Sequence, residues 1–185
     1  MSKNQNNIYN MHTSKNLPED LFIAQEHIYN LCGFKCSSLQ VEPESAEYGA
    51  CQLTINKNQI IFRIAKTTPT KSGQFVTIWK RIGNGPIQPY DFSDDFDLIV
   101  ISTRKDNLLG QFVFPKSILL TKGIISGNNK DGKRGIRVYP PWEPVTSKQA
   151  EKTQAWQLQY FLWIQGGPNV DVERAVKLYQ KGANL

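Results

Sequence analysis

The sequence predicts an α/β protein in which a single mixed β-sheet is flanked by helices. Segments near both ends of the chain carry apolar residues at helical spacing, which predicts amphipathic helices. The middle of the chain consists of short runs rich in β-branched and aromatic residues, bounded by Gly, Pro and Asn, which predicts strands and turns. This order indicates one sheet covered by helices. We expect residues 1–16, which are polar and Asn-rich, to be frayed, and residues 17–185 to form one domain.

The first helix is expected over residues 18–32. Asn16 can cap its start, its first turn is acidic, and Gly33 provides a stop. A tight turn at 56–58 is expected between two strands, and one helical turn at 116–120. From alternation and composition, strands are predicted at residues 48–55, 59–66, 75–79, 98–102, 110–114 and 136–139.

The longest predicted helix covers residues 147–165. Thr146 and Gln149 form a capping box at its start, and a Gly-Gly-Pro sequence ends it. Several aromatic residues in its second half give it a large apolar face. A last helix is expected over residues 171–181, before Gly182.

Composition limits the classes of partner. The net charge is +6 and the pI is near 9.2, which favours an anionic partner such as nucleic acid or a phosphorylated small molecule. No apolar run reaches the roughly 20 residues that span a bilayer, and no signal peptide opens the chain. The three cysteines lack CxxC spacing and cannot form a full disulfide framework. We therefore expect a cytoplasmic protein with reduced thiols, no cofactor and no membrane partner.

We expect the segment 59–81 to form a basic β-hairpin that carries the main part of the binding site. It contains no carboxylate, and its cations are Arg63, Lys66, Lys71, Lys80 and Arg81. Surface strands usually mix charges of both signs, so a hairpin of one sign indicates that an anion docks there. The alternative is a solvated edge strand that lysines protect from aggregation.

A second basic segment interleaves cations with aromatic rings. It contains Lys130, Lys133, Arg134, Arg137, Tyr139, Trp142, Lys148, Lys152 and Trp156. Such a pattern suits nucleic acid, because cations neutralise phosphates and rings offer faces on which bases stack. The alternative is that the tryptophans pack in the core and residues 130–134 form a solvated loop tip.

Several enzyme classes lack their motifs in this sequence. No G-x-S-x-G, P-loop or G-x-G-x-x-G pattern is present, and the two histidines, His12 and His27, both lie near the start of the chain. Asp94, Asp95 and Asp97 form an acidic cluster that suits Mg²⁺ or Ca²⁺, although an acidic turn before a strand is also commonplace. We expect no bound metal.

Four long segments of the chain resemble the MepB family. They are TPTKSGQFVTIWKR, GPIQPYDFSDDFDLIVIS, GQFVFPKSIL and GKRGIRVYPPWEPVTSKQAEKTQAWQLQYF. The resemblance extends from about residue 20 to residue 165. The family is known mainly for being encoded beside a multidrug efflux pump and its regulator, so the resemblance implies no particular activity.

A second resemblance is to the PD-(D/E)xK, or restriction-endonuclease-like, superfamily, and it implies a core of that type. It rests on QLTINKNQIIFRIAKTT and on the later strand pair DFDLIVIS and GQFVFPKSIL. Aligned without gaps, Lys66 falls on the motif lysine, while Gln52 and Ile64 occupy the positions of the two metal-binding acids. Glu47 can stand in for the acid before the first strand. Because cleavage needs carboxylates to hold Mg²⁺, this resemblance implies a nuclease-like scaffold that binds nucleic acid without cutting it.

We therefore expect a largely sequence-independent nucleic-acid-binding protein, with DNA rather than RNA as its partner. Sequence preference should be slight, because phosphate contacts carry no base information. Tyr139 and Trp142 are the expected stacking rings. The cations expected to form one basic groove are Arg63, Lys66, Lys71, Lys80, Arg81, Lys133, Arg134, Arg137, Lys148 and Lys152.

Three alternatives stay open at this point. A metal-dependent nuclease would use Glu47, Lys66 (or Lys71) and an acid of the 94–97 cluster, with Asp97 as the candidate. A binder of a phosphorylated or otherwise anionic small molecule would place Lys66, Lys71 and Arg137 around one closed pocket. A role in binding other proteins is neither supported nor excluded by the sequence.

Overall fold

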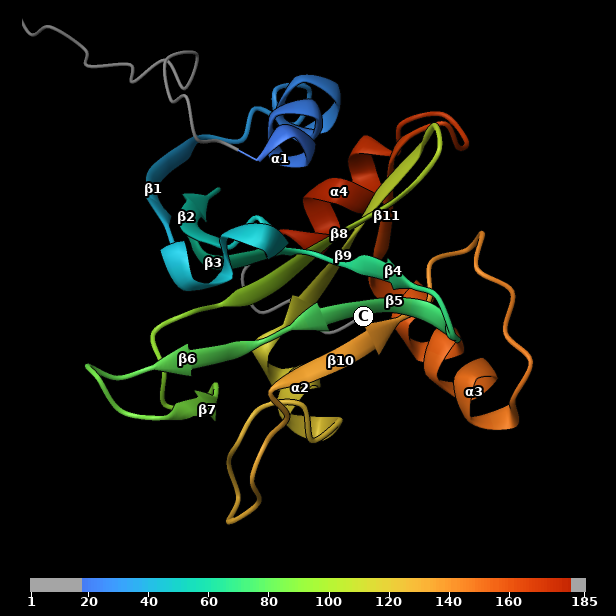
Figure 1. Ribbon diagram of the computed structural model, residues 1–185. Helices are drawn as coiled ribbons and strands as arrows, with labels where there is room; N and C mark the ends of the chain where they lie inside the picture. Colours follow the sequence, from blue (N-terminus) through green and yellow to red (C-terminus); the bar gives the residue numbers. More distant parts are fainter. Residues whose placement is uncertain (1–17, 181–185) are drawn as a thin grey trace, which may run out of the picture.

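The computed structural model describes residues 18–180 (Figure 1). The predicted frayed segment 1–16 and the predicted cap Asn16 lie outside these residues. A six-stranded sheet has the order β1-β2-β3-β8-β9-β11. Its strands are β1 (Cys36–Val41), β2 (Cys51–Ile55), β3 (Asn58–Ile64), β8 (Leu98–Lys105), β9 (Leu108–Pro115) and β11 (Phe161–Gln165). The predicted α/β class with a mixed sheet is confirmed.

The centre of this sheet follows from turn chemistry and apolar strands. β2 and β3 form the predicted hairpin, with Asn56 and Lys57 both at positive φ (48° and 69°) in the tight turn. β3 then pairs with β8 in parallel, and β8 with β9 antiparallel. The apolar side chains of β8 and β9 are buried on both faces, which explains their nearly continuous apolar sequence.

Helices from near the two ends of the chain cover one face of the large sheet, and a second sheet lies on the other face together with the helix of residues 148–157 (Figure 1). The predicted first helix is present as α1 (Glu19–Ala24) followed by the π-helical turn η2 (Gln25–Tyr29), and it ends at Gly33 with φ 68°. Asp20 binds Ser102 Oγ at 2.7 Å and Arg104 Nη2 at 2.6 Å, which fixes α1 to β8. The predicted last helix is present as α4 (Val172–Leu178). β1 was not predicted.

The sequence predicted a single sheet, whereas the structure adds a second and a third, smaller sheet to the large one. The second sheet has the order β10-β5-β4, with β4 (Lys66–Thr68), β5 (Lys71–Thr77) and β10 (Gly135–Val138). A third, two-stranded sheet consists of β6 (Trp79–Arg81) and β7 (Ile87–Pro89). The expected hairpin of 59–66 with 75–79 is therefore wrong, because β3 stays in the large sheet and only β4 pairs with β5. The change occurs at Ala65, whose N–H still bonds to Ser102 O of β8.

The predicted long helix 147–165 is wrong in its second half. The structure has α3 (Lys148–Gln157), a 3-10 turn η4 (Leu158–Tyr160), and then strand β11, which pairs with β9. The aromatic residues after 160 are buried as a strand on the sheet edge, and this tertiary pairing overrides their helical spacing. The helix cap is Ser147, which accepts from the Ala150 N–H, rather than the predicted Thr146.

The remaining short elements are η3 (Pro43–Tyr48), a 3-10 segment, and α2 (Lys116–Thr121), the predicted helical turn. Within residues 18–180, no helix is long and apolar enough to cross a membrane. The three cysteines are free thiols, and burial raises the pKa of Cys36 to about 11 and that of Cys51 to about 12.

Candidate functional site

Arg63 is not part of any exposed basic surface. Its side chain is 1% exposed and donates to Glu42 Oε2 at 2.6 Å, to the Tyr90 hydroxyl at 3.0 Å and to its neighbour's carbonyl. The predicted nucleic-acid contact at Arg63 is therefore wrong. A charge pattern in a strand does not reveal which face is covered, and here Glu42, just before η3, and Tyr90 lie against the Arg63 side chain.

Four further predicted cations are engaged by carboxylates. Lys80 pairs with Asp94, while the other pairs are Lys66–Glu47 at 2.9 Å, Arg81–Glu44 at 2.9 Å and Arg134–Asp131 at 3.6 Å. The acidic partners come from η3 and from loops that the hairpin sequence does not contain. An ion-paired cation contributes little net field, so these positions do not extend a basic groove.

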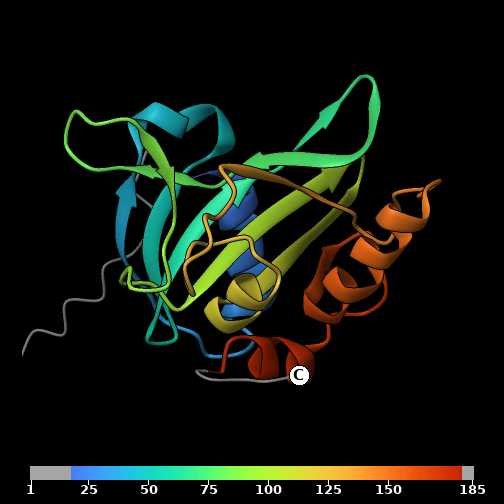
Figure 2. The same cartoon turned by 90° about the horizontal axis from the view of Figure 1, so that it is seen from below.

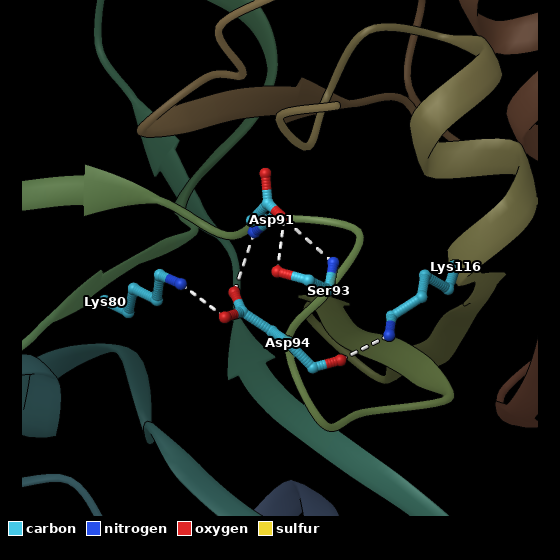
Figure 3. Close-up of polar contacts among 5 residues, drawn as sticks. All are labelled: Lys80, Asp91, Ser93, Asp94 and Lys116. Carbon is cyan, nitrogen blue, oxygen red and sulfur yellow. Dashed lines mark hydrogen bonds and ion pairs between the residues drawn. The ribbon is translucent and has the colours of Figure 1, made fainter. Parts of the chain in front are cut away.

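The acidic side chains after β7 form hydrogen bonds within their own loop (Figure 3). The Ser93 N–H and hydroxyl donate to Asp91 Oδ1 at 2.8 and 2.6 Å, and these bonds hold the Asp91 pKa below its ordinary value. Asp94 accepts from the Asp91 N–H at 2.7 Å and from Lys80, and its carbonyl accepts from Lys116. Among the described residues, no group of three or more His, Cys, Asp or Glu is placed to hold a metal ion.

The candidate nuclease residues do not converge. Glu47 and Lys66 form an ion pair, but Asp97 accepts from the Gln59 N–H at the opposite end of β3. Lys66 is seven positions after Gln59, so Asp97 lies roughly 20 Å from the lysine.

The two positions aligned with metal-binding acids also face apart. Gln52 pairs with Ile61 in the β2–β3 ladder, so its side chain lies on the same face of the sheet as the odd-numbered residues of β3. The Gln52 amide donates to Glu42. Ile64 is on the even-numbered face. The ungapped alignment therefore does not produce a metal site.

A basic pocket of about 610 Å³ lies between β10, α3 and the segment after α2. In Figures 1 and 2, β10 runs from beside α2 to α3. Four cations line this pocket, and no carboxylate does: Lys71 begins β5, Lys122 follows α2, Lys133 precedes β10, and Arg137 is in β10. Within residues 18–180 none of the four is in an ion pair with a carboxylate.

Arg137 is the most firmly positioned of these cations. Its guanidinium donates to Gly73 O at 2.9 Å and to Thr68 Oγ1 at 2.8 Å. It also lies 5.9 Å from the centre of the Phe75 ring, directly opposite in the ladder. Because these partners are neutral, they fix the guanidinium without cancelling its charge.

Aromatic and apolar side chains form the other walls of the basic pocket. Tyr139 is half-buried there, packed against Gly73, where a Cβ would lie 2.6 Å from the ring. Trp156 lies on the α3 side, 5.3 Å from Lys122 Nζ and 5.3 Å from the Phe114 ring. Ile124 and Ile136 complete the apolar part of the lining.

The remaining predicted residues are placed outside the basic pocket. Trp142 is not part of its lining and packs against Trp163 and Phe161, with ring centres 5.1 and 5.6 Å away. Its ring thus belongs to an internal aromatic cluster rather than to a stacking platform beside Tyr139. Lys148 and Lys152 are exposed on α3, whereas Gln149 and Thr153 of the same helix face the pocket.

The sequence-based interpretation missed Lys122 and Gln157. Lys122 stands alone beside a glycine, so no charge cluster marked it. Gln157 is buried in the pocket wall, where its amide donates to Arg137 O at 3.0 Å and accepts from Tyr139 N at 2.9 Å. A single glutamine in a helix carries no signal of such a role.

The chain belongs to the MepB-like family, whose model matches residues 42–163. A solved structure described as the crystal structure of MepB is 36% identical. The similarity covers 71% of this chain and 89% of that one, with a TM-score of 0.67. No curated protein matches the chain. The matched range includes all four pocket cations, and the predicted MepB resemblance is confirmed.

Proposed function

We propose that this protein binds nucleic acid and that the basic pocket holds phosphates of the bound strand. One observation carries the proposal: four cations from separate segments line one cavity that contains no carboxylate. Among the residues that the structure describes, none of the four is paired with a carboxylate, whereas most of the predicted cations outside the pocket are neutralised by a nearby acid. Release of counterions from phosphates by such cations is the main source of affinity in nucleic-acid binding.

The surroundings of the basic pocket support a strand as its occupant. Lys148 and Lys152 are exposed on α3, next to the pocket-lining side of that helix, and can meet phosphates outside the cavity. We propose DNA as the partner, in the cytoplasm, where the three free thiols stay reduced. The separation of Glu47 and Lys66 from Asp97 supports binding without metal-dependent cleavage.

Salt-dependent binding tests this proposal. Fluorescence anisotropy with a labelled DNA strand should give an affinity that falls steeply with salt, with a log–log slope of about 3 if four phosphates are engaged. Lys133→Glu should weaken binding and reduce the slope by about 1. Lys35→Glu is the matched control, because this exposed lysine precedes β1 at the far edge of the large sheet. A slope near zero, or equal effects of both variants, would contradict the proposal.

A phosphorylated small molecule is the second candidate ligand. The volume of the basic pocket, about 610 Å³, is in the range of small-ligand sites, and the cations beyond it are largely ion-paired. The two candidates differ in their dependence on ligand length. Affinity that rises from mononucleotide to longer strands supports nucleic acid, whereas a mononucleotide that binds as tightly as a strand supports the small molecule.

A further inference from the structure

β10 presents a free backbone edge to the basic pocket. It is the edge strand of the sheet β10-β5-β4. Arg134 O accepts from Ile78 N, so the even-numbered residues of β10 are the ones whose main-chain groups hydrogen-bond to β5. Because an antiparallel ladder alternates, Gly135 and Arg137 direct their N–H and C=O groups away from β5, toward the free edge.

The chain itself caps both ends of this edge. At one end the Lys133 N–H donates to Ile124 O at 2.9 Å. At the other end the Gln157 amide bridges Arg137 O and Tyr139 N. Between these caps lie the Gly135 N–H and C=O and the Arg137 N–H, to which no loop or side chain from residues 18–180 is hydrogen-bonded. Both residues line the pocket.

Gln157 shows what kind of group this edge accepts. Its planar amide carries a donor and an acceptor side by side, and it binds the C=O of one residue and the N–H two residues later. Gly135 C=O and Arg137 N–H form the same pair, one repeat earlier in the strand. The open pair therefore fits a second planar group with adjacent donor and acceptor. The Watson–Crick edge of a nucleobase is such a group.

The short distance between the two caps on the edge of β10 also limits which ligand can bind there. A partner peptide adds to a sheet edge through several consecutive main-chain bonds, but the edge between the two caps is short: within residues 18–180 it leaves open the Gly135 N–H and C=O and the Arg137 N–H. A single flat ring fits this length, and Ile136, Lys122 and Lys133 line the same pocket, so the two lysines can serve its phosphate. The pocket thus suits one nucleotide better than an extended peptide.

We propose that the basic pocket holds an unpaired nucleobase, whose Watson–Crick edge bonds to Gly135 C=O and Arg137 N–H. The inference rests on the proposed nucleic-acid binding and adds a preference for single strands, because a base in a duplex has this edge already paired. Thymine, for example, would accept from Arg137 N–H through a carbonyl and donate to Gly135 C=O from its N3–H.

Chemically modified strands test the inference without altering the protein. The affinities of three labelled ligands are compared by anisotropy: an oligothymidine strand, the same strand with N3-methylthymidine, and a duplex. The methyl group removes the donor and blocks the edge while leaving every phosphate in place. The unmodified strand should bind about tenfold more tightly than either of the others, as expected for the loss of one to two hydrogen bonds.

Amide hydrogen exchange supplies a second readout at the edge itself. The unmodified strand should slow exchange at Arg137 N–H, and the methylated strand should not. Equal affinities of the methylated and unmodified strands, with salt dependence retained, would overturn the base-edge inference and leave nucleic-acid binding intact. Absence of binding to every strand would overturn both.

Discussion

Arg63 and Glu42 form an ion pair of 2.6 Å in which the arginine side chain is only 1% exposed. The Tyr90 hydroxyl completes this arrangement at 3.0 Å from Arg63 Nη2. The guanidinium connects β3 to the segment before η3 and to the residue after β7, three parts of the chain far apart in sequence. A residue that looks like a phosphate contact in the sequence is thus a structural cation.

The first prediction follows from this burial. Arg63→Ala should lower the free energy of unfolding by about 3–5 kcal/mol, because it removes a fully buried guanidinium and leaves the half-buried Glu42 carboxylate without its cation. Urea denaturation measures the change. Lys66→Ala is the control, because Lys66 and Glu47 are an exposed pair and their loss should cost about 1 kcal/mol or less. A stable Arg63→Ala variant with weakened DNA binding would contradict the assignment.

The second prediction concerns the pairing of β9 with β11. A Cβ at Gly110 would lie 2.1 Å from the Phe161 ring. Gly110→Ala should therefore displace β11 and destabilise the protein by about 1–3 kcal/mol, as expected for overpacking in a core. Gly123→Ala is the control for replacing a glycine where space is available, because no atom lies within 4 Å of an added Cβ there. The positive φ of Gly123, 61°, adds local backbone strain to this control. Thermal unfolding of both variants gives the comparison, and equal losses would argue against the strand pairing.

The third prediction concerns Gln157. Gln157→Ala removes both hydrogen bonds to the edge of β10 and should cost about 1–3 kcal/mol, since two part-buried backbone groups lose their partner. Hydrogen exchange at Tyr139 N–H should become faster. Gln149→Ala, an exposed pocket residue on the same helix, should change neither quantity.

The fourth prediction compares the contributions to DNA binding of two lysines, one identified from the structure and one predicted from the sequence. Lys122→Ala should weaken DNA binding several-fold, because an unpaired lysine of the basic pocket is lost. Lys80→Ala should change it little, because Lys80 is already paired with Asp94. Salt titrations of both variants measure the effect, and the reverse order would show that the basic pocket is not the binding site.

The fifth prediction is a loss of stability in alkali. Burial raises the pKa of Cys51 from 9.0 and that of Tyr90 from 10.0, each to about 12. The unfolded chain releases these protons first, so their contribution to stability is complete below pH 9 and is lost between pH 9 and pH 12. The free energy of unfolding falls by about 1.4 kcal/mol per pH unit for each group, between pH 9 and pH 12 for Cys51 and between pH 10 and pH 12 for Tyr90. Urea midpoints under reducing conditions should show a shallower decline for Cys51→Ala.

Much of the core could be predicted from residue patterns because local chemistry fixes it. The Asn56–Lys57 turn requires positive φ, and the apolar runs of β3, β8 and β9 are long enough to be buried on both faces. The second half of the predicted helix 147–165 could not be assigned in this way. Its aromatic residues fit the spacing of either a helix or a strand, and they form a strand because the edge of β9 is available for pairing.

The sequence by itself determined that the protein is basic, that its family is MepB-like and that cations and aromatic rings are interleaved near Arg137. The tertiary structure alone decided which cations of the chain lack a carboxylate partner among the described residues. Lys71, Lys122, Lys133 and Arg137 meet in one pocket because β5, β10 and the end of α2 pack together, while acids from η3 and the 91–97 loop neutralise Lys66, Lys80 and Arg81. Charge is a property of residues, but its cancellation depends on distances that only folding sets.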